Sequence, residues 1–214
     1  MSPEDLGRTW SSRDPSAFET AATPGGRVAA IARSAALIRQ WVKADDVVLD
    51  IGCGVGLLAT YLDTVPIIGV DFSSALLSAA RGRLPVMLGS VFALPIRQGA
   101  PAVVACLFVL DDYDTATKRR TLSLLASVLR PNGHLLIAGY APDDERMGPR
   151  RGEVSAMEWE VYLEDEPFYR DALAAVGDKR TLSLEHIRTT AVVQPPGSSP
   201  MQRHFIVASV RLSV

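Results

Sequence analysis

Three glycines and an aspartate near residue 50 are the residues of this chain whose types and spacing most clearly indicate chemistry. The run Val47–Leu49 is β-branched and aliphatic and leads into Asp50, after which Gly52, Gly54 and Gly56 alternate with single residues. Glycine lets a backbone approach a bound molecule closely, and N–H groups at the start of a following helix favour an anion. The order of strand, glycine turn and helix therefore predicts a nucleotide-type site.

A second acid follows at the distance that such a site requires. Asp71 closes the apolar run Ile67–Val70, about 20 residues beyond the glycine turn, where a carboxylate can accept hydrogen bonds from both hydroxyls of a ribose. Phe72, beside it, is a candidate to stack on a base. The alternative interpretations are structural: the glycine turn only packs a helix against a strand, and Asp71 only caps the next helix.

The glycine spacing separates two kinds of nucleotide site. A dinucleotide fingerprint needs a third glycine at position 57, and that residue is Leu57. The G-x-G-x-G spacing, the strand ending in Asp71, the segment Gly89–Pro95 and the segment Leu129–Ile137 together resemble the motifs of class I S-adenosylmethionine-dependent methyltransferases of the small-molecule branch. The resemblance runs from about residue 45 to residue 140.

The resemblance implies S-adenosyl-L-methionine as cofactor and assigns roles to residues in its motifs. The glycine turn would take the methionine carboxylate, Asp50 the ammonium group, Asp71 the ribose, and the end of the fourth strand the methionine moiety. Ser90 stands where the family has an acid that contacts adenine, so a backbone N–H of Val91 or Phe92 is the remaining candidate there. The predicted cofactor-binding residues are Asp50, Gly52, Cys53, Gly54, Gly56, Asp71, Phe72, Ser90, Val91, Phe92, Leu107 and Phe108.

The methyl acceptor is expected at the ends of the fourth and fifth strands. Methyl transfer needs proximity and alignment, and a general base helps when the acceptor is a hydroxyl. The candidate catalytic residues at these strand ends are Asp111, Asp112, Tyr113 and Tyr140. The alternative is that the aspartates cap the next helix and that Tyr113 packs under a loop.

Histidine and metal chemistry receive little support from the sequence. His134 begins a strand at the wrong end of the sheet, His204 begins another, and His186 lies within a strand. Asp111 and Asp112 alone do not supply the several spaced ligands that a metal-dependent site needs. We therefore expect no histidine base and no metal.

The periodicity predicts an α/β fold that positions these residues. Seven strands alternate with helices, and the unbroken apolar run Ala102–Leu110 is typical of a parallel strand buried on both faces. We expect a Rossmann-like, doubly wound sheet, mainly parallel with one antiparallel strand and with helices on both faces. The expected strands are 47–50, 67–70, 85–88, 102–110, 134–138, 181–193 and 204–212, and the expected helices are 27–42, 75–83, 115–129 and 167–176.

Two segments outside this alternation are expected to cover the acceptor. Residues 1–26 form a polar N-terminal arm or lid, and residues 27–214 form the methyltransferase domain with a cap insertion at about 141–165. The apolar residues of the arm and the cap could close over the site and exclude water, or simply bury these segments against the domain. They are Trp10, Phe18, Met147, Met157, Trp159 and Tyr162.

Composition limits the partners and the compartment. The net charge of −2 argues against nucleic acid as the main partner, because phosphate binding requires clustered Lys and Arg. No apolar run is long enough to suggest a membrane span, and no secretory signal is apparent. With two cysteines, we expect a reduced, cytoplasmic protein that binds a small-molecule substrate and is a monomer or a homodimer.

The sequence favours methyl transfer to a small organic acceptor, most simply a hydroxyl, in a biosynthetic pathway of secondary metabolism. Two alternatives stay open. A non-methylating member of the fold would keep the cofactor as a scaffold for cyclisation or binding, because fold does not fix chemistry. An NAD(P)-dependent oxidoreductase is disfavoured by Leu57 and by the lack of a Tyr-x-x-x-Lys pair.

Overall fold

The computed structural model describes residues 26–145, 162–192 and 199–213. The predicted N-terminal arm and most of the predicted cap, with Trp10, Phe18, Met147, Met157 and Trp159, lie outside the described residues. Among the described residues, no helix is both long enough and apolar enough to span a bilayer.

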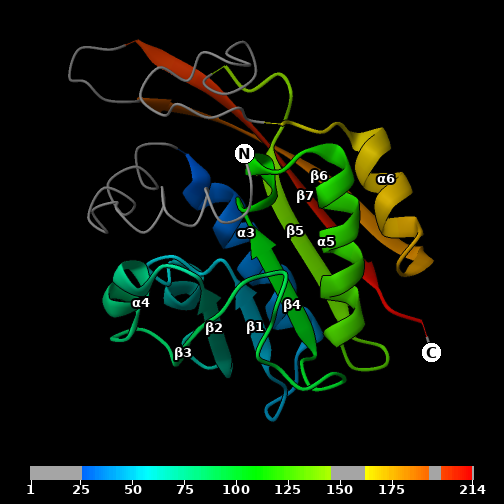
Figure 1. The fold of residues 1–214 in the computed structure, drawn as a ribbon. Coiled ribbons are helices and arrows are strands. Elements are labelled where there is room, and N and C mark those ends of the chain that lie inside the picture. The colour runs from blue at the N-terminus through cyan, green and yellow to red at the C-terminus, as the bar shows by residue number, and fades with distance from the viewer. Residues whose placement is uncertain (1–25, 146–161, 193–198, 214) are drawn as a thin grey trace.

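One seven-stranded sheet organises the chain, in the order β3-β2-β1-β4-β5-β7-β6 (Figure 1). Strands β1 to β5 are mutually parallel, and β7 runs antiparallel to both β5 and β6. The predicted mainly parallel sheet with one antiparallel strand is confirmed. The strands are β1 (Val48–Ile51), β2 (Ile67–Asp71), β3 (Val86–Leu88), β4 (Val103–Leu107), β5 (His134–Tyr140), β6 (Asp178–Val192) and β7 (Pro200–Arg211).

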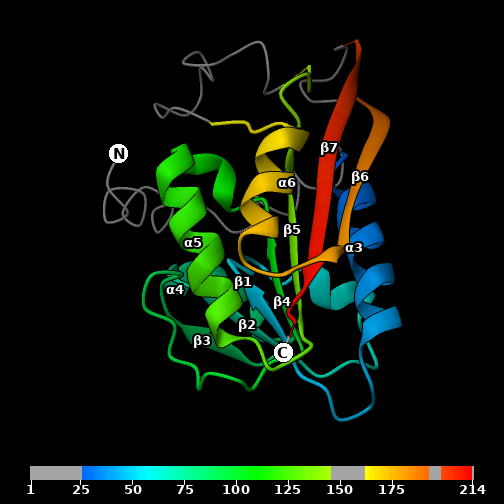
Figure 2. The ribbon, with the colours of Figure 1, turned by 90° about the vertical axis from the view of Figure 1, so that its right-hand side faces the viewer.

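Helices cover both faces of this sheet (Figure 2). Short polar residues fix where three of them begin, because the side chains of Ser73, Asp114 and Asp165 accept the N–H groups of Leu76, Thr117 and Phe168. The helices are α3 (Arg27–Trp41), α4 (Ser74–Ala80), α5 (Thr115–Val128) and α6 (Glu166–Ala174), with 3-10 turns η1 (Leu58–Tyr61) and η2 (Leu110–Asp112).

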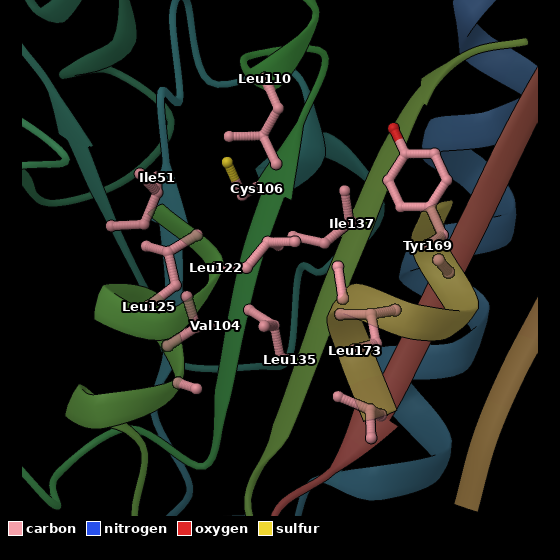
Figure 3. Packing of buried hydrophobic residues seen from close by; sticks show 14 of the residues in the cluster. Ile51, Val104, Cys106, Leu110, Leu122, Leu125, Leu135, Ile137, Tyr169 and Leu173 are labelled. Carbon is pink, nitrogen blue, oxygen red and sulfur yellow. The ribbon is translucent and has the colours of Figure 1, made fainter. Parts of the chain in front are cut away.

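Alternate residues of the central strands pack into two separate cores. On β4, Val104 and Cys106 face the core beneath α5 and α6, together with Leu122 and Leu173 (Figure 3). Val103 and Ala105 face the opposite core, beneath α3. Because both faces of β4 are buried, an unbroken apolar strand is what this position in a parallel sheet requires.

Several elements differ from the sequence prediction. The residues after the glycine turn, where the sequence indicates a helix over 57–62, form the four-residue 3-10 helix η1. Strand β4 ends at Leu107, because Phe108 adopts a left-handed φ of 60° that breaks the extended backbone. Strand β6 begins earlier, at Asp178, because its pairing with β7 extends past an irregularity to Arg211. Strand β7 begins earlier, at Pro200, because the pairing also continues toward the hairpin loop, where Pro200 pairs with Val192.

A buried ion pair connects the end of β5 to β7. The guanidinium of Arg203 donates to both carboxylate oxygens of Asp144, at 2.9 and 3.1 Å, and both side chains are fully buried. Asp144 also accepts the backbone N–H of His204 at 2.8 Å. Arg203 in turn lies over the rings of Tyr140 and Phe205. This pair therefore supports the aromatic residues beside the ends of β4 and β5.

Replacing Asp144 by Asn should lower the free energy of unfolding by about 3 kcal/mol, because the buried guanidinium of Arg203 would lose the charge of the carboxylate that it binds through two hydrogen bonds. The control is Asp171→Asn, which breaks the exposed Arg119–Asp171 pair and should change stability by less than about 0.5 kcal/mol. Urea unfolding of both variants measures the difference. Equal effects in the two variants would contradict the structural importance of the buried pair.

Candidate active site

A pocket opens at the carboxyl ends of β1, β2 and β4, where an open α/β sheet binds its ligands. Many of the predicted residues line it, but Gly56, Ser90, Val91, Phe92, Asp111 and Tyr140 do not. The predicted residues that line the pocket are Asp50, Gly52, Cys53, Gly54, Asp71, Phe72, Leu107, Phe108, Asp112 and Tyr113.

The glycine turn needs its glycines for backbone conformation and for space. Gly52, Gly54 and Gly56 all have positive φ, at 68°, 53° and 80°. A Cβ on Gly52 would lie 2.3 Å from a methyl of Val109, and one on Gly56 would lie 2.6 Å from a methyl of Leu84. Larger residues would therefore strain the turn, and they would push it away from the segment after β4 at Gly52 and from the segment before β3 at Gly56.

Several N–H groups of this turn already have partners within the protein. Gly52 and Cys53 both donate to the carbonyl of Val70, at 2.7 and 3.2 Å, and Gly56 donates to Cys53. Gly54 donates to Oδ2 of Asp71 at 2.9 Å. The expectation that these groups stay open to an anion is therefore not met at these four positions. The one-turn η1 that follows also lacks the aligned peptides of a strong helix dipole.

Asp71 is held by the backbone on both sides of its carboxylate. Oδ1 accepts the N–H of Ser73 at 2.8 Å, and Oδ2 accepts the N–H of Gly54. Burial raises the pKa of this carboxyl, although the backbone hydrogen bonds oppose the shift. Each oxygen keeps acceptor capacity for a further donor, because an ionised carboxylate offers about four lone-pair sites. The group is thus oriented at the pocket wall as a hydrogen-bond acceptor.

Asp50 stands at the end of β1 and also lines the pocket. Its side chain is 4 % exposed and forms no hydrogen bond within the described part of the chain. Burial, with a further contribution from the charge of Asp71, raises the pKa of its carboxyl to about 8. A cationic ligand group would offset both causes, so this position favours an ammonium.

The predicted adenine segment folds back on itself. The N–H of Phe92 donates to the hydroxyl of Ser90 at 3.2 Å, and Ser90 forms a β-bridge with Ala93. Val91 is buried, and the ring of Phe92 packs edge-on against Tyr113, 5.5 Å between centroids. The segment therefore supports the pocket wall through Tyr113.

The four candidates on the acceptor side separate into two groups. Asp112 and Tyr113 line the pocket, and burial raises the pKa of the Tyr113 hydroxyl. Asp111 is 4 % exposed, and its Oδ2 accepts the N–H of Tyr140 at 3.2 Å. The backbone carbonyl of Asp111 accepts the N–H of Tyr162 at 2.8 Å. Asp111 therefore holds the end of β5 and the chain returning from the predicted cap.

Burial also raises the pKa of Asp111, to about 7, while the nearby Lys118 ammonium opposes the shift. Its Oδ1 and the hydroxyl of Tyr169 are both buried without a hydrogen-bond partner in the described structure. A Cβ on Gly139 would lie 2.7 Å from this Oδ1 and 3.1 Å from this hydroxyl. Gly139 thus leaves the space that these two polar groups share, a place suited to an ordered water.

The histidines lie away from the pocket lining. His134 stacks on Trp41, and burial together with Arg211 and Arg130 lowers its pKa to about 4. His186 and His204 bond to each other at 2.8 Å through ring nitrogens and also contact Glu166 and Asp143. Among the described residues, no group of three His, Cys, Asp or Glu side chains is arranged to bind a metal.

Sequence reasoning missed seven lining residues, of which two have unusual surroundings. Val109 follows Phe108, which is strained by its positive φ, and packs on the glycine turn. Arg27, the first residue of α3, places its guanidinium 5.6 Å from the centre of the Phe108 ring. The available sequence signal was a basic residue directly after Pro24-Gly25-Gly26. The missed residues are Arg27, Ile31, Val55, Leu57, Leu58, Leu76 and Val109.

Known proteins share the domain and the fold. A family profile described as a methyltransferase domain matches residues 48–133. No curated protein sequence gives a significant match. A Haloferax volcanii protein solved in complex with the Trm112 methyltransferase activator is 18% identical with a TM-score of 0.72, covering 100% of this chain and 99% of that one.

Two further solved structures resemble the chain. Magnesium protoporphyrin IX methyltransferase of Synechocystis PCC 6803 with bound S-adenosylhomocysteine is 19% identical with a TM-score of 0.62, covering 86% of this chain and 83% of that one. The YcgJ protein of Bacillus subtilis is 16% identical with a TM-score of 0.64, covering 85% and 99%. At these identities the likeness establishes the fold. The methyltransferase domain match covers the part of that fold from β1 to the turn before β5, which contains the glycine turn, Asp50 and Asp71.

Proposed function

We propose that this protein transfers the methyl group of S-adenosyl-L-methionine to a small organic acceptor, with a hydroxyl as the acceptor group. The observation that carries the proposal is the pairing of two buried carboxylates, Asp50 and Asp71, across one glycine turn in one pocket. Asp50 suits an ammonium, and Asp71 suits two hydroxyls. S-Adenosylmethionine presents both kinds of donor, on its amino acid and on its ribose.

The residues present fit this cofactor. Asp71, fixed by Gly54 and Ser73, would accept from the ribose hydroxyls, and Asp50 would accept from the ammonium. Phe72 and Leu76 offer apolar surface on the ribose side of the pocket. When bound, the cofactor supplies an electrophilic methyl on a sulfonium with a neutral leaving group. The protein's own contribution is to align the acceptor with that methyl.

On the acceptor side, Asp112 and Tyr113 are the polar groups that the pocket offers. In this proposal Asp112 accepts a proton from an acceptor hydroxyl, and Tyr113 donates a hydrogen bond to its oxygen. Asp111 acts indirectly, because it fixes Tyr140 and Tyr162 through backbone hydrogen bonds. We assign it a positioning role. The Phe108 and Tyr140 rings pack together beside the ends of β4 and β5, with 5.2 Å between their centroids, and so stiffen this wall.

A small acceptor is supported by the apolar and aromatic character of the pocket lining and by the slightly acidic net charge of −2, which disfavours nucleic acid. The Synechocystis neighbour is named for magnesium protoporphyrin IX, which is a small molecule. Incubating the protein with methyl-labelled S-adenosylmethionine and a panel of phenols, alcohols, amines and carboxylic acids tests this. Labelled methyl ethers are expected, whereas labelled amines or esters alone would contradict a hydroxyl acceptor.

A scaffold role without methyl transfer is the second candidate function, favoured by the fact that two of the four candidate catalytic residues do not line the pocket. Tight S-adenosylhomocysteine binding with no label transfer to any acceptor class would favour it. NADH fluorescence enhancement would instead favour an oxidoreductase. We expect neither outcome.

Replacing Asp71 by Ala should weaken S-adenosylhomocysteine binding at least tenfold, about 1.4 kcal/mol, because the ribose hydroxyls lose their acceptor. Asp63→Ala, at an exposed position outside the pocket, is the matched control and should leave the affinity unchanged. Calorimetric titration of both variants makes the comparison. If Asp71→Ala binds as tightly as the wild type, the cofactor assignment fails.

The ionisation of Asp50 should affect both the free energy of unfolding and the affinity for the cofactor, in opposite directions as the pH rises. Its folded pKa of about 8 exceeds the unfolded value of 3.8, so the folded state holds the proton more tightly. The free energy of unfolding without ligand should therefore fall as pH rises from about 4 to about 8. Asp50→Asn should remove part of this slope and be more stable than the wild type at pH 8, by on the order of 2 kcal/mol. Asp111 still contributes below pH 7 in both proteins.

The same variant should bind S-adenosylhomocysteine more weakly, since an amide cannot neutralise the ammonium. At pH 7 the wild type should release up to one proton on binding, because the incoming ammonium favours the carboxylate form of Asp50. Calorimetry in two buffers of different ionisation enthalpy measures this release. Proton release of the same size from Asp50→Asn would show that another group titrates.

A further inference from the structure

Arg27 is the one basic residue among the described residues that line the pocket. It is the first residue of α3, and its guanidinium lies over the face of the Phe108 ring, 5.6 Å from the centroid. Gly26 sets this start point, because its φ of 77° turns the chain where a Cβ would crowd Thr189 and Arg203 at 3.1 and 3.2 Å. The backbone thus fixes where the arginine enters the pocket.

The position of Arg27 is unfavourable for the helix that carries it. A cation in the first turn opposes the helix dipole, and α3 has neither an acidic residue in that turn nor a side-chain cap. Its one basic residue in the last turn is Arg39, where a cation is favourable. Residues that break a local rule without local compensation are expected at functional sites.

Arg27 has no carboxylate within ion-pair distance in the described part of the chain, and its charge acts on the buried Asp111 only from farther away. Arg33, on the same helix, forms a bidentate pair with Glu185, and Arg203 forms one with Asp144. The Phe108 ring packs against one face of the Arg27 guanidinium. The N–H groups at the edge of the guanidinium remain available to donate hydrogen bonds to an anion.

The cofactor brings one group that the aspartates of the pocket cannot bind. S-Adenosylmethionine carries an ammonium, a sulfonium and one carboxylate. Asp50, Asp71 and Asp112 supply acceptors and negative charge around the pocket. The N–H groups of Gly52, Cys53, Gly54 and Gly56 are engaged within the protein. A carboxylate in this pocket therefore needs a cation, and Arg27 is the residue that supplies one.

The place of Arg27 along the sheet agrees with this role. Asp71 and Phe72 follow β2, Asp50 ends β1, and Phe108 follows β4, in the strand order β2-β1-β4. A cofactor whose ribose is at Asp71 and whose ammonium is at Asp50 extends toward β4. The amino-acid end then lies beside Phe108, beneath the guanidinium of Arg27.

We propose that Arg27 binds the carboxylate of the methionine moiety through its guanidinium, while the Phe108 ring holds the guanidinium in place. This inference rests on the proposed function, since it assumes S-adenosylmethionine in the pocket. An acceptor carboxylate is the other source of the same chemistry at this position, and the test below distinguishes the two. The interaction is a charge-assisted, geometrically matched pair of the kind that arginine forms with carboxylates.

The test uses S-adenosylhomocysteine and its decarboxylated analogue, which keeps the adenine, the ribose and the amine. Calorimetric affinities of both ligands are measured for the wild type, Arg27→Gln, Arg27→Lys and Arg33→Gln. Arg27→Gln should weaken S-adenosylhomocysteine binding 10- to 100-fold and change the affinity of the analogue less than twofold. Arg27→Lys should retain part of the affinity, and Arg33→Gln, outside the pocket, should retain all of it.

The stability of Arg27→Gln should equal or exceed that of the wild type, because a cation is removed from a helix start, so weak binding would not reflect misfolding. An equal loss for both ligands would overturn the inference, since Arg27 would then only shape the pocket. Arg27→Gln could instead bind both ligands normally and bind only carboxylate-bearing acceptors more weakly. That result would assign Arg27 to the acceptor and would also overturn the inference. If the wild type binds neither ligand, the proposed function itself fails.

Discussion

The hydrogen bond from the N–H of Gly54 to the carboxylate of Asp71 is the interaction on which the site depends. It joins the glycine turn after β1 to the end of β2, and the N–H of Ser73 completes the hold on the second oxygen. Because both N–H groups come from the backbone, the carboxylate is oriented before any ligand arrives. The glycine turn and Asp71 therefore support each other structurally. They lie about 20 residues apart in sequence because a crossover connection must bring β2 parallel to β1.

The residues that could be predicted from sequence are those whose role is local. The glycine turn, Asp50 and Asp71 follow from strand ends and spacing, and the buried run of β4 follows from its apolar character. The choice between Asp111 and Asp112 could not be predicted, because the two residues are adjacent and chemically alike, and the conformation of η2, which contains both, decides which one lines the pocket. Arg27 could not be placed either, since its contact with Phe108 spans 81 positions and depends on how α3 docks on the sheet.

The buried acids beside the pocket lower the stability of the free protein and make a cationic ligand electrostatically favourable there. Burial raises the pKa values of Asp50, Asp71 and Asp111, which means that their ionised forms are incompletely solvated. A ligand with complementary charge relieves this cost for the two acids that line the pocket. Binding and folding are thus coupled, as expected where a functional site holds residues that are unfavourable for stability alone.

The placement of β7 between β5 and β6 has a consequence for how the protein is made. The strand that pairs with β5 comes from residues 200–211, so all the other strands are synthesised before it. Until then the growing chain carries an unpaired inner edge on β5, and Asp144 has no Arg203 to neutralise it. If β1 to β5 form their part of the sheet before residues 200–211 are synthesised, that sheet has an unpaired edge on β5, and such edges are prone to pair with other chains.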